Sequence, residues 1–348
     1  MYINNITGGN MNTAVYTPEW VREDFVDFVA EKFHPTWAWK KVKAELVSKR
    51  TLSPNFHEFI LRPNHNFDAT QFQAGQSLLV TVVVKGVRQQ RSYSIIHIDE
   101  YGIHIAVKQQ GLVSNALAAL PIHSVIELSQ VQGEFTLNTQ TTQPLLFIAS
   151  GSGITAIYSL LKQALKQNQS IEMIYFSRDC AYHHEIESLH QQFDHFSYHL
   201  VDTSKTKLHF SEELLKHMVP DYENRACYAC GASGMMQDLH ALYESRELQN
   251  QLKTEYFQLS IDPTLDAQPV TFARAQQTFM ADASLLESAE KAGLKPAHGC
   301  RIGICNTCSC TKVQGAVRNV LTGEIDQGNN TQIKLCISQA VSPVVINL

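Results

Sequence analysis

The spacing of apolar and polar positions divides the chain into stretches of different period. From Lys41 to about Asn138, short runs rich in β-branched and aromatic residues are separated by Gly, Pro and Asn. Many short strands at this density are typical of an antiparallel Greek-key β-barrel. The predicted strands are KVKAELVSKR, HEFILRP, SLLVTVVV, RSYSII, GIHIAVK and SVIELSQV, with one short helix over residues 114–120.

From Pro144 the pattern becomes an alternation of apolar strands and helical runs. This alternation predicts an α/β domain with a parallel sheet and crossover helices. The predicted strands are LLFIAS, IEMIYFS, FSYHLVD and RACYACG, and the predicted helices are ITAIYSLLKQALKQ, EIESLHQQF and SGMMQDLHALYES.

The two ends of the chain follow neither pattern. Pro18 is expected to open a helix that runs to about Ala30, and aromatic residues such as Trp37 are interpreted as packing anchors of an N-terminal arm. Pro263 and Pro269 mark a linker before a small α+β unit with the helix ASLLESAEKAG. The expected units are an extension (1–40), the barrel (41–140), the α/β domain (141–258), a linker (259–267) and the small domain (268–348).

Composition narrows the class of protein. The chain has 348 residues, 44% of them hydrophobic, and a net charge of −5, which argues against a nucleic-acid partner. No apolar run approaches the roughly 18–20 residues of a membrane span, and the N-terminus lacks the features of a signal peptide. We therefore expect a soluble, cytoplasmic protein. Eight cysteines in such a protein favour metal binding over a disulfide scaffold.

Four cysteines have the spacing of an iron–sulfur site. Cys300, Cys305 and Cys308 form C-x4-C-x2-C, and Cys336 follows at a distance. This is the plant-type spacing in which four thiolates hold a [2Fe–2S] cluster, so these four are the predicted metal ligands. Gly299 and Gly303 give the loop backbone freedom. The other cysteines are Cys180, Cys227, Cys230 and Cys310, of which Cys310 is interpreted as a packed free thiol.

Two motifs in the barrel region are suited to a flavin dinucleotide. In Arg91-Ser92-Tyr93-Ser94 a cation, an aromatic ring and hydroxyl groups alternate along a strand. A flavin dinucleotide needs such groups: a cation for its pyrophosphate, a ring that stacks on the flavin, and a donor near the redox-active flavin nitrogen. Gly111 precedes the short helix, where Ser114 can cap the helix while its N–H groups face phosphate. Each motif alone is more often an ordinary polar strand or a capped turn.

Three motifs in the α/β region are suited to a nicotinamide nucleotide. Residues 151–155 (GSGIT) follow a strand and precede a helix, which is the place for dinucleotide phosphates. Arg178, after the second strand, can pair with a 2′-phosphate, although a solvated Arg is as common. Cys230 and Gly231 end a strand at the ligand edge, although a free Cys is more often a buried apolar residue. The fifteen histidines are not expected to form a second metal site.

The ordered series RSYS, GLVSN, GSGIT, CG and C-x4-C-x2-C…C resembles ferredoxin–NADP reductase-like enzymes fused to a C-terminal plant-type ferredoxin, over residues 41–348. The resemblance implies an FAD-binding barrel, a nicotinamide-binding α/β domain and a β-grasp ferredoxin domain. It implies that Tyr93, Ser94 and Cys230 act at the flavin and the nicotinamide. The expected FAD residues are Arg91, Ser92, Tyr93, Ser94, Val107, Lys108, Gly111, Val113 and Ser114. The expected NADPH or NADH residues are Gly151, Gly153, Ile154, Thr155, Ser177, Arg178, Cys230 and Gly231.

The sequence departs from many relatives at Ala156 and Ala232, where Pro is common, but neither change removes a functional group. The family includes an FMN branch, the phthalate dioxygenase reductases, and the GLVSN motif favours FAD. Since a nicotinamide gives two electrons as hydride and the cluster takes one, the flavin lies between them.

The partner is less sharply defined. The segment HPTWAWKKVKAEL is similar to the reductase partners of bacterial acyl-CoA desaturases, so we expect electron transfer to a fatty acyl desaturase, with docking to a membrane-bound enzyme. Phenylacetyl-CoA oxygenase reductases share the domain order, so a reductase for an aromatic-ring or acyl-CoA oxygenase is the alternative. A non-enzymatic iron–sulfur redox sensor is the alternative of another class.

Overall fold

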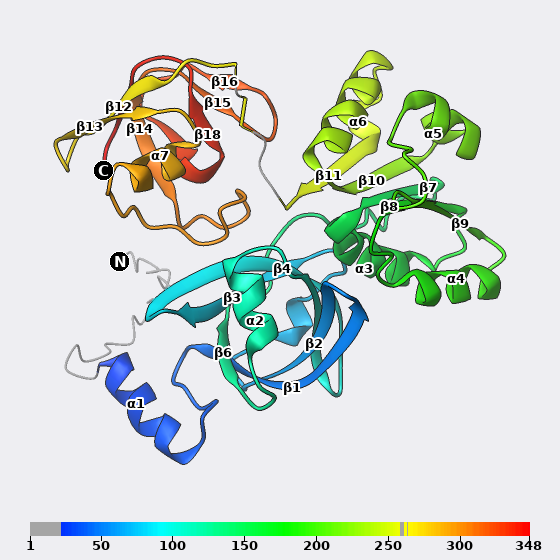
Figure 1. Ribbon diagram of the computed structural model, residues 1–348, viewed down its shortest axis with the longest axis horizontal. Helices are drawn as coiled ribbons and strands as arrows, with labels where there is room; N and C mark the ends of the chain where they lie inside the picture. The colour runs from blue at the N-terminus through cyan, green and yellow to red at the C-terminus, as the bar shows by residue number, and fades with distance from the viewer. Residues whose placement is uncertain (1–21, 258–260, 263) are drawn as a thin grey trace, which may run out of the picture.

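The apolar runs of the first half close into a six-stranded antiparallel barrel with the order β1-β2-β5-β4-β3-β6 (Figure 1). The computed structural model describes residues 22–257, 261–262 and 264–348. The strands are β1 (Val42–Ser53), β2 (Phe56–Pro63), β3 (Ser77–Val84), β4 (Val87–Asp99), β5 (Gly102–Lys108) and β6 (Val125–Leu128). Alternate side chains such as Leu46, Phe59, Leu78 and Ile95 fill the interior.

Helix α2 (Leu112–Ala119) lies over the barrel and begins two residues before the predicted position. Val113 and Leu117 on its inner face join the barrel core. Gly111 stands at the N-cap, and the Ser114 hydroxyl accepts hydrogen bonds from the backbone N–H groups of Gln110 (3.1 Å) and Gly111 (2.9 Å). Ser114 therefore caps the loop before the helix from a position inside the first helical turn. The sequence pattern predicts Ser114 itself as the first residue of the helix.

The α/β domain is a five-stranded parallel sheet with the order β11-β10-β7-β8-β9. Its strands are β7 (Leu145–Ser150), β8 (Ile171–Ser177), β9 (Phe196–Asp202), β10 (Ala226–Gly231) and β11 (Leu252–Tyr256). Its helices are α3 (Ile154–Ala164), α4 (His183–Gln192), α5 (Glu212–Met218) and α6 (Ser233–Ser245). Strand β11 and helix α5 were not expected from the sequence, because both are short and rich in charged residues.

Helix α3 joins the two larger domains. Nine of its eleven residues are buried, since it packs on the sheet with one side and toward the barrel with the other. Barrel residues Phe56, Ile96 and Ala106 belong to the same apolar core as Ile157 and Leu161 of this helix. The barrel and the α/β domain therefore share one continuous core.

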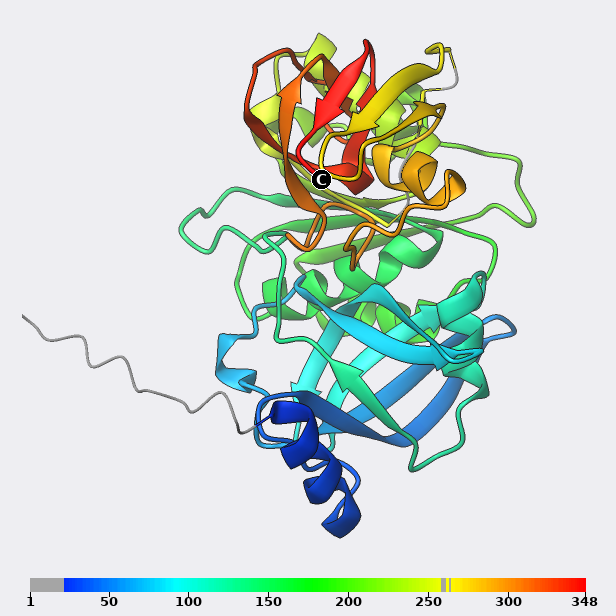
Figure 2. The same ribbon diagram turned by 90° about the vertical axis from the view of Figure 1, so that its left-hand side faces the viewer.

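The C-terminal domain has a five-stranded sheet of order β13-β12-β19-β14-β17 and a three-stranded sheet of order β16-β15-β18. Its elements are β12 (Gln268–Phe272), β13 (Gln277–Ala281), α7 (Leu285–Lys291), β14 (Ser309–Gln314), β15 (Val317–Asn319), β16 (Ile325–Asp326), β17 (Thr331–Lys334), β18 (Ser338–Ala340) and β19 (Val344–Ile346). In two perpendicular views this domain lies beside both the barrel and the α/β domain (Figures 1 and 2). The predicted linker lies partly outside the described residues.

Helix α1 (Glu23–Phe33) corrects the prediction for the N-terminal extension. Pro18 lies outside the described residues, and the helix ends three residues later than expected. The predicted aromatic anchors do not pack as expected, because Trp37 and Trp39 are exposed. Phe25 and Phe28 of the helix are exposed as well, and Asp27 is its buried residue. The reason is that ion pairs with Lys41 hold the acidic side of α1 against the protein. Among the described ranges, every helix is too short or too polar to cross a membrane.

Candidate functional site

The two barrel motifs meet around one cavity of about 270 Å³ between the barrel and the first turn of α3. Strand β4 supplies RSYS, and its partner β5 ends at Lys108 just before the Gly111 turn, so the register of the barrel brings the motifs together. Every residue predicted for the flavin lines this cavity: Arg91, Ser92, Tyr93, Ser94, Val107, Lys108, Gly111, Val113 and Ser114.

The side chains of this cavity fit a flavin dinucleotide. Burial lowers the pKa of Arg91, and the nearby Arg301 lowers it further, whereas Glu290, which raises it, is paired with Arg301. Among the described residues, Arg91 therefore has no carboxylate at ion-pair distance. Burial raises the pKa of Tyr93, which keeps its ring neutral and available for stacking. The Ser94 hydroxyl is buried and has no hydrogen-bond partner among the described residues. A bound anion and a polar ring edge would satisfy these groups.

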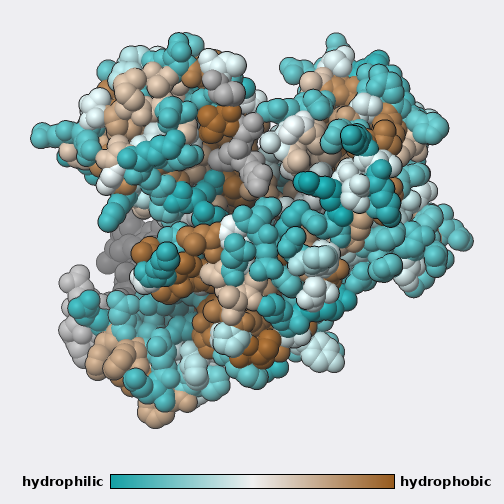
Figure 3. Space-filling view, in the orientation of Figure 1, coloured by the Kyte–Doolittle hydropathy of each residue, from teal (hydrophilic) through white to brown (hydrophobic). Residues whose placement is uncertain are grey.

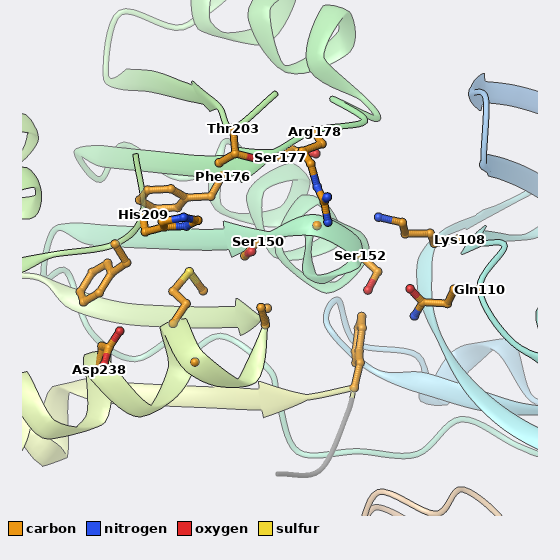
Figure 4. A pocket seen from close by; sticks show the side chains of 17 residues that line it. Lys108, Gln110, Ser150, Ser152, Phe176, Ser177, Arg178, Thr203, His209 and Asp238 are labelled. Carbon is orange, nitrogen blue, oxygen red and sulfur yellow. The ribbon is translucent and has the colours of Figure 1, made fainter. Parts of the chain in front are cut away.

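A second cavity of about 690 Å³ opens at the carboxyl ends of the parallel strands, where nucleotides bind in folds of this kind. Figure 4 shows Arg178, after β8, and Lys108, from the barrel, with their side chains directed toward each other across it. Lys108 also forms an ion pair with Asp179 (2.6 Å). These cations suit the phosphates of a dinucleotide.

Only part of the predicted nucleotide set lines this second cavity. Gly151, Ser177, Arg178 and Gly231 do so, whereas Thr155 lines the flavin-side cavity. Three predicted residues line neither cavity: Gly153, Ile154 and Cys230.

Gly153 and Cys230 have a packing relationship. A Cβ atom on Gly153 would lie 1.9 Å from the Cys230 carbonyl oxygen, so the glycine permits α3 to start directly against the end of β10. The Cys230 side chain is fully buried, and burial, together with Glu255, raises the pKa of its thiol well above its usual value.

Two residues at the end of β11 were missed by the sequence reasoning. Phe257 lines both cavities and therefore stands at their boundary. Glu255 pairs in register with Cys230, and its carboxylate is buried with one oxygen lacking a hydrogen bond among the described residues. Burial raises the pKa of Glu255 to about 8. Their signal in the sequence is weak, because the run LKTEYF is short and mixes charged with apolar residues.

The four predicted metal ligands converge in the C-terminal domain. Cys300, Cys305, Cys308 and Cys336 are all buried, and none forms a disulfide. Cys308 Sγ lies 3.3 Å from Cys336 Sγ, and the backbone N–H groups of Cys300 and Cys305 donate to each other's sulfur at 3.3 and 3.2 Å.

The environment of these thiols fits a cluster held by four thiolates. The hydrogen bonds within the two pairs lower the pKa of Cys305 and Cys308 and raise the pKa of their partners, Cys300 and Cys336. The fit therefore rests on the position of the four sulfurs and on the backbone N–H groups directed at them. Cys310 is buried on β14 in the same apolar core as Cys308 and Cys336, and no hydrogen bond joins its thiol to either of them.

The cysteine loop (residues 298–308) packs on the barrel. Cys300, Cys305, Ile302 and Ile304 form an apolar cluster with Leu79 of β3. Leu79 of β3 pairs with Ser92 of the neighbouring strand β4, and paired side chains share one face of a sheet, so this contact lies beside the strand that lines the flavin-side cavity.

The histidines do form one cluster that the sequence analysis did not expect. Among the described residues, ligand atoms of His97, Asp99 and His104 lie within 4.8 Å of one another. The two rings stack with centroids 3.9 Å apart at 23°, so their nitrogen lone pairs run side by side and do not converge on one point. His104 Nε2 donates a hydrogen bond to Asp99 Oδ1 (3.1 Å), and His97 Nδ1 lies 3.0 Å from Lys162 Nζ of α3. We interpret the cluster as a polar contact between the barrel and the α/β domain.

Comparison with known proteins gives the same three units in the same order. Residues 43–137 match the family described as oxidoreductase FAD-binding domain, and residues 147–241 match the oxidoreductase NAD-binding domain. Residues 270–341 match the 2Fe-2S iron-sulfur cluster binding domain.

Relatives extend over most of the chain. An NADPH oxidoreductase of Mycobacterium tuberculosis is 27% identical over 332 residues, which cover 90% of this chain and 86% of that protein. A glycine betaine monooxygenase reductase subunit of Chromohalobacter salexigens is 24% identical over 322 residues, which cover 79% and 87%. The structure of phthalate dioxygenase reductase shares the fold with a TM-score of 0.61 and 23% identity, over 88% of this chain and 97% of that one.

These matches exclude the redox-sensor alternative, since FAD-binding and NAD-binding domains precede the cluster domain. The chain is therefore a ferredoxin–NADP reductase-like flavoprotein with a C-terminal [2Fe–2S] ferredoxin domain, an oxidoreductase that transfers electrons from NAD(P)H through FAD to the cluster.

Proposed function

We propose that this reductase delivers single electrons to a separate protein, and that this acceptor is a fatty acyl desaturase. The observation that supports this electron path is the contact between Leu79 and the cysteine loop, because Leu79 pairs with Ser92 of the strand that lines the flavin-side cavity and packs against two of the predicted metal ligands. The segment HPTWAWKKVKAEL, similar to the reductase partners of acyl-CoA desaturases, supports the choice of acceptor.

The cavity residues have separable roles in this proposal. Arg91 binds the FAD pyrophosphate, Tyr93 stacks on the flavin ring, and the unpartnered Ser94 hydroxyl bonds to the reactive edge. Arg178 and Lys108 hold phosphate groups of the nicotinamide nucleotide on the other side of Phe257. The flavin supplies the conversion of a two-electron donor into one-electron steps. The residues of this chain orient the two ring systems and keep water out.

The second candidate acceptor is an oxygenase. It is favoured by the relatives from Chromohalobacter salexigens and Pseudomonas aeruginosa that are named glycine betaine monooxygenase reductase subunits. We further propose a cytoplasmic location, because all eight cysteines are free thiols, as is usual in a reducing compartment.

Reconstitution with purified acceptors tests the proposal. The holoprotein and NADPH are mixed either with a fatty acyl-CoA desaturase or with the terminal component of a ring-hydroxylating oxygenase, and product is measured by mass spectrometry. We expect turnover with the desaturase. Product formation with the oxygenase alone would replace the desaturase by the second candidate, and absence of transfer to either protein would refute both acceptors.

A further inference from the structure

Helix α1 is attached to the barrel by its acidic side. Lys41 Nζ lies 3.0 Å from Asp24 Oδ1 and 3.0 Å from Asp27 Oδ2. Asp27 Oδ1 also accepts a hydrogen bond from the backbone N–H of Trp39 (2.8 Å), and Lys43 pairs with Glu31. These residues recur every three or four positions, so one face of the helix is held by charge.

The opposite face is apolar and turned outward. Phe25, Phe28 and Phe33 are 67%, 59% and 76% exposed, and Val29 lies between them. Trp37 and Trp39, in the segment after the helix, are exposed too. Figure 3 shows light-brown, moderately hydrophobic atoms among teal ones over α1 at the lower left of the molecule. An ordinary surface helix buries this kind of face, so the orientation of α1 is inverted.

The charges that remain on the outward side are cationic. Lys32 Nζ lies 4.9 Å from the centre of the Phe28 ring, and Lys40 Nζ lies 5.0 Å from the centre of the Trp39 ring. Within the described residues, no carboxylate lies within ion-pair distance of either lysine, since the nearby acids Asp24, Asp27 and Glu31 pair with Lys41 and Lys43. The outward surface therefore combines aromatic rings with unpaired positive charge.

We propose that the outward face of α1, with Trp37 and Trp39, docks on an anionic lipid surface. Aromatic and apolar side chains with flanking lysines are the composition of helices that lie in the plane of a membrane interface. Tryptophan settles at the headgroup level, and lysine stems extend from apolar surroundings toward lipid phosphates. The negative surface of the cytoplasmic leaflet complements the unpaired lysines.

The position of α1 in the molecule is compatible with this contact. In both perpendicular views the helix lies at the end of the molecule remote from the ferredoxin domain (Figures 1 and 2). A membrane beneath α1 would leave the nucleotide cavity and the cysteine loop accessible. The proposal goes beyond the choice of electron acceptor and does not depend on it.

The tryptophans make the test direct. The chain has three, Trp20, Trp37 and Trp39, so its tryptophan emission reports on this end of the chain alone. The full-length holoprotein is mixed with vesicles of phosphatidylcholine alone or of phosphatidylcholine with phosphatidylglycerol, and binding is measured by flotation and by the emission shift. We expect a blue shift and flotation with the anionic vesicles, and quenching by brominated acyl chains.

Two variants and one control define the surface. F25S/F28S/F33S should weaken partition by at least about tenfold, because burial of a single Phe side chain is worth about that factor. K32E/K40E should abolish the preference for anionic lipid. The control M280S/I325S removes exposed apolar residues of the ferredoxin domain and should leave binding unchanged. All three should retain NADPH-driven reduction of cytochrome c, which shows that they are folded.

Four results would overturn the proposal. The first is absence of binding to either vesicle. The second is binding that appears only after deletion of residues 1–21, which would make this segment the natural cover of α1. The third is a concentration-dependent dimer that F25S/F28S/F33S abolishes, which would make the face an interface between copies. The fourth is retention by a purified acceptor protein without lipid. Since no vesicle assay contains an acceptor, failure here leaves the proposed function untouched.

Discussion

Leu79 of the barrel packs against Cys300 of the cysteine loop in a small apolar cluster that also holds Cys305. A Cβ atom on the adjacent Gly299 would lie 3.4 Å from Gln90 Oε1 of β4, so the loop backbone approaches the barrel closely. The ferredoxin domain is thus docked with two of its predicted metal ligands facing the barrel. This contact lies between the predicted cluster site and the flavin-side cavity.

A charge at this contact should uncouple the two centres. We expect L79E to slow reduction of the cluster by NADPH by up to about tenfold for each loss of about 1.4 kcal/mol in docking free energy, since such a loss lowers the ratio of docked to undocked molecules tenfold. Reduction of the flavin should be unchanged, because Leu79 does not line the flavin-side cavity. Stopped-flow absorbance resolves both steps.

The matched control for this variant is V83E on the same strand, whose side chain is 65% exposed. It should transfer electrons at the wild-type rate. Equal rates in L79E and wild type would show that the contact is not on the electron path.

The cysteine assignment predicts a contrast between two buried thiols. C300S should abolish the visible absorption of the cluster and transfer to one-electron acceptors routed through it, while NADPH still bleaches the flavin. C310S should keep the cluster, because Cys310 packs in the domain core on β14. Visible spectra before and after NADPH distinguish the two variants, and loss of the cluster in C310S alone would reverse the ligand assignment.

Much of this arrangement could be predicted from the sequence. The barrel strands, the alternation of strand and helix and the spacing of the cysteines are local signals, and neighbouring strands β4 and β5 bring two distant motifs to one cavity. The roles of Leu79 and Phe257 could not be predicted, because they arise only when domains close on each other.

The orientation of α1 shows a further limit. Periodicity identifies two faces of a helix, but which face turns inward was decided by Lys41 and Lys43 on the following segment. Hydrophobic burial would place the Phe25 face inward, and the ion pairs place it outward.

Arg178 should contribute to the preference for NADPH. Its side chain is directed into the nucleotide cavity beside Lys108, where a 2′-phosphate would form charge-assisted hydrogen bonds (Figure 4). We expect R178A to raise the dissociation constant for NADP⁺ by about tenfold or more and that for NAD⁺ by much less. Calorimetric titration with both nucleotides measures this, with the exposed barrel residue Arg62 (R62A) as the control. An equal rise in the dissociation constants for NADP⁺ and NAD⁺ would show that Arg178 does not discriminate between the two nucleotides.

Glu58 should stabilise the contact between the barrel and the α/β domain in a pH-dependent way. Burial favours its protonated form. The nearby His104 ring (Nδ1 at 3.8 Å), the hydrogen bond from Tyr182 (2.9 Å) and the charge of Arg50 outweigh burial and lower the pKa of Glu58 to about 2. Because the pKa is lower in the folded protein, the stabilisation is present above pH 4.5 and is lost as the pH falls toward 2.

Urea unfolding of E58Q checks this prediction. At neutral pH the free energy of unfolding should fall by roughly 2–3 kcal/mol relative to wild type, and the difference should shrink on acidification. The exposed Glu100 offers a control in E100Q. A difference that does not change with pH would assign the effect to packing.

Glu255 should make the free energy of unfolding depend on pH in the opposite direction to Glu58. Burial raises its pKa to about 8, so the folded protein binds a proton that the unfolded chain releases near pH 4.5. The free energy of unfolding should therefore decrease as the pH rises from about 4.5 to about 8, by on the order of a few kcal/mol, and level off above this range. In E255Q, which keeps the shape and cannot ionise, this decrease should disappear, and the variant should exceed wild type in stability at the alkaline end. Urea unfolding of both proteins across this range measures the slope, and an unchanged slope in E255Q would assign the titration to another group.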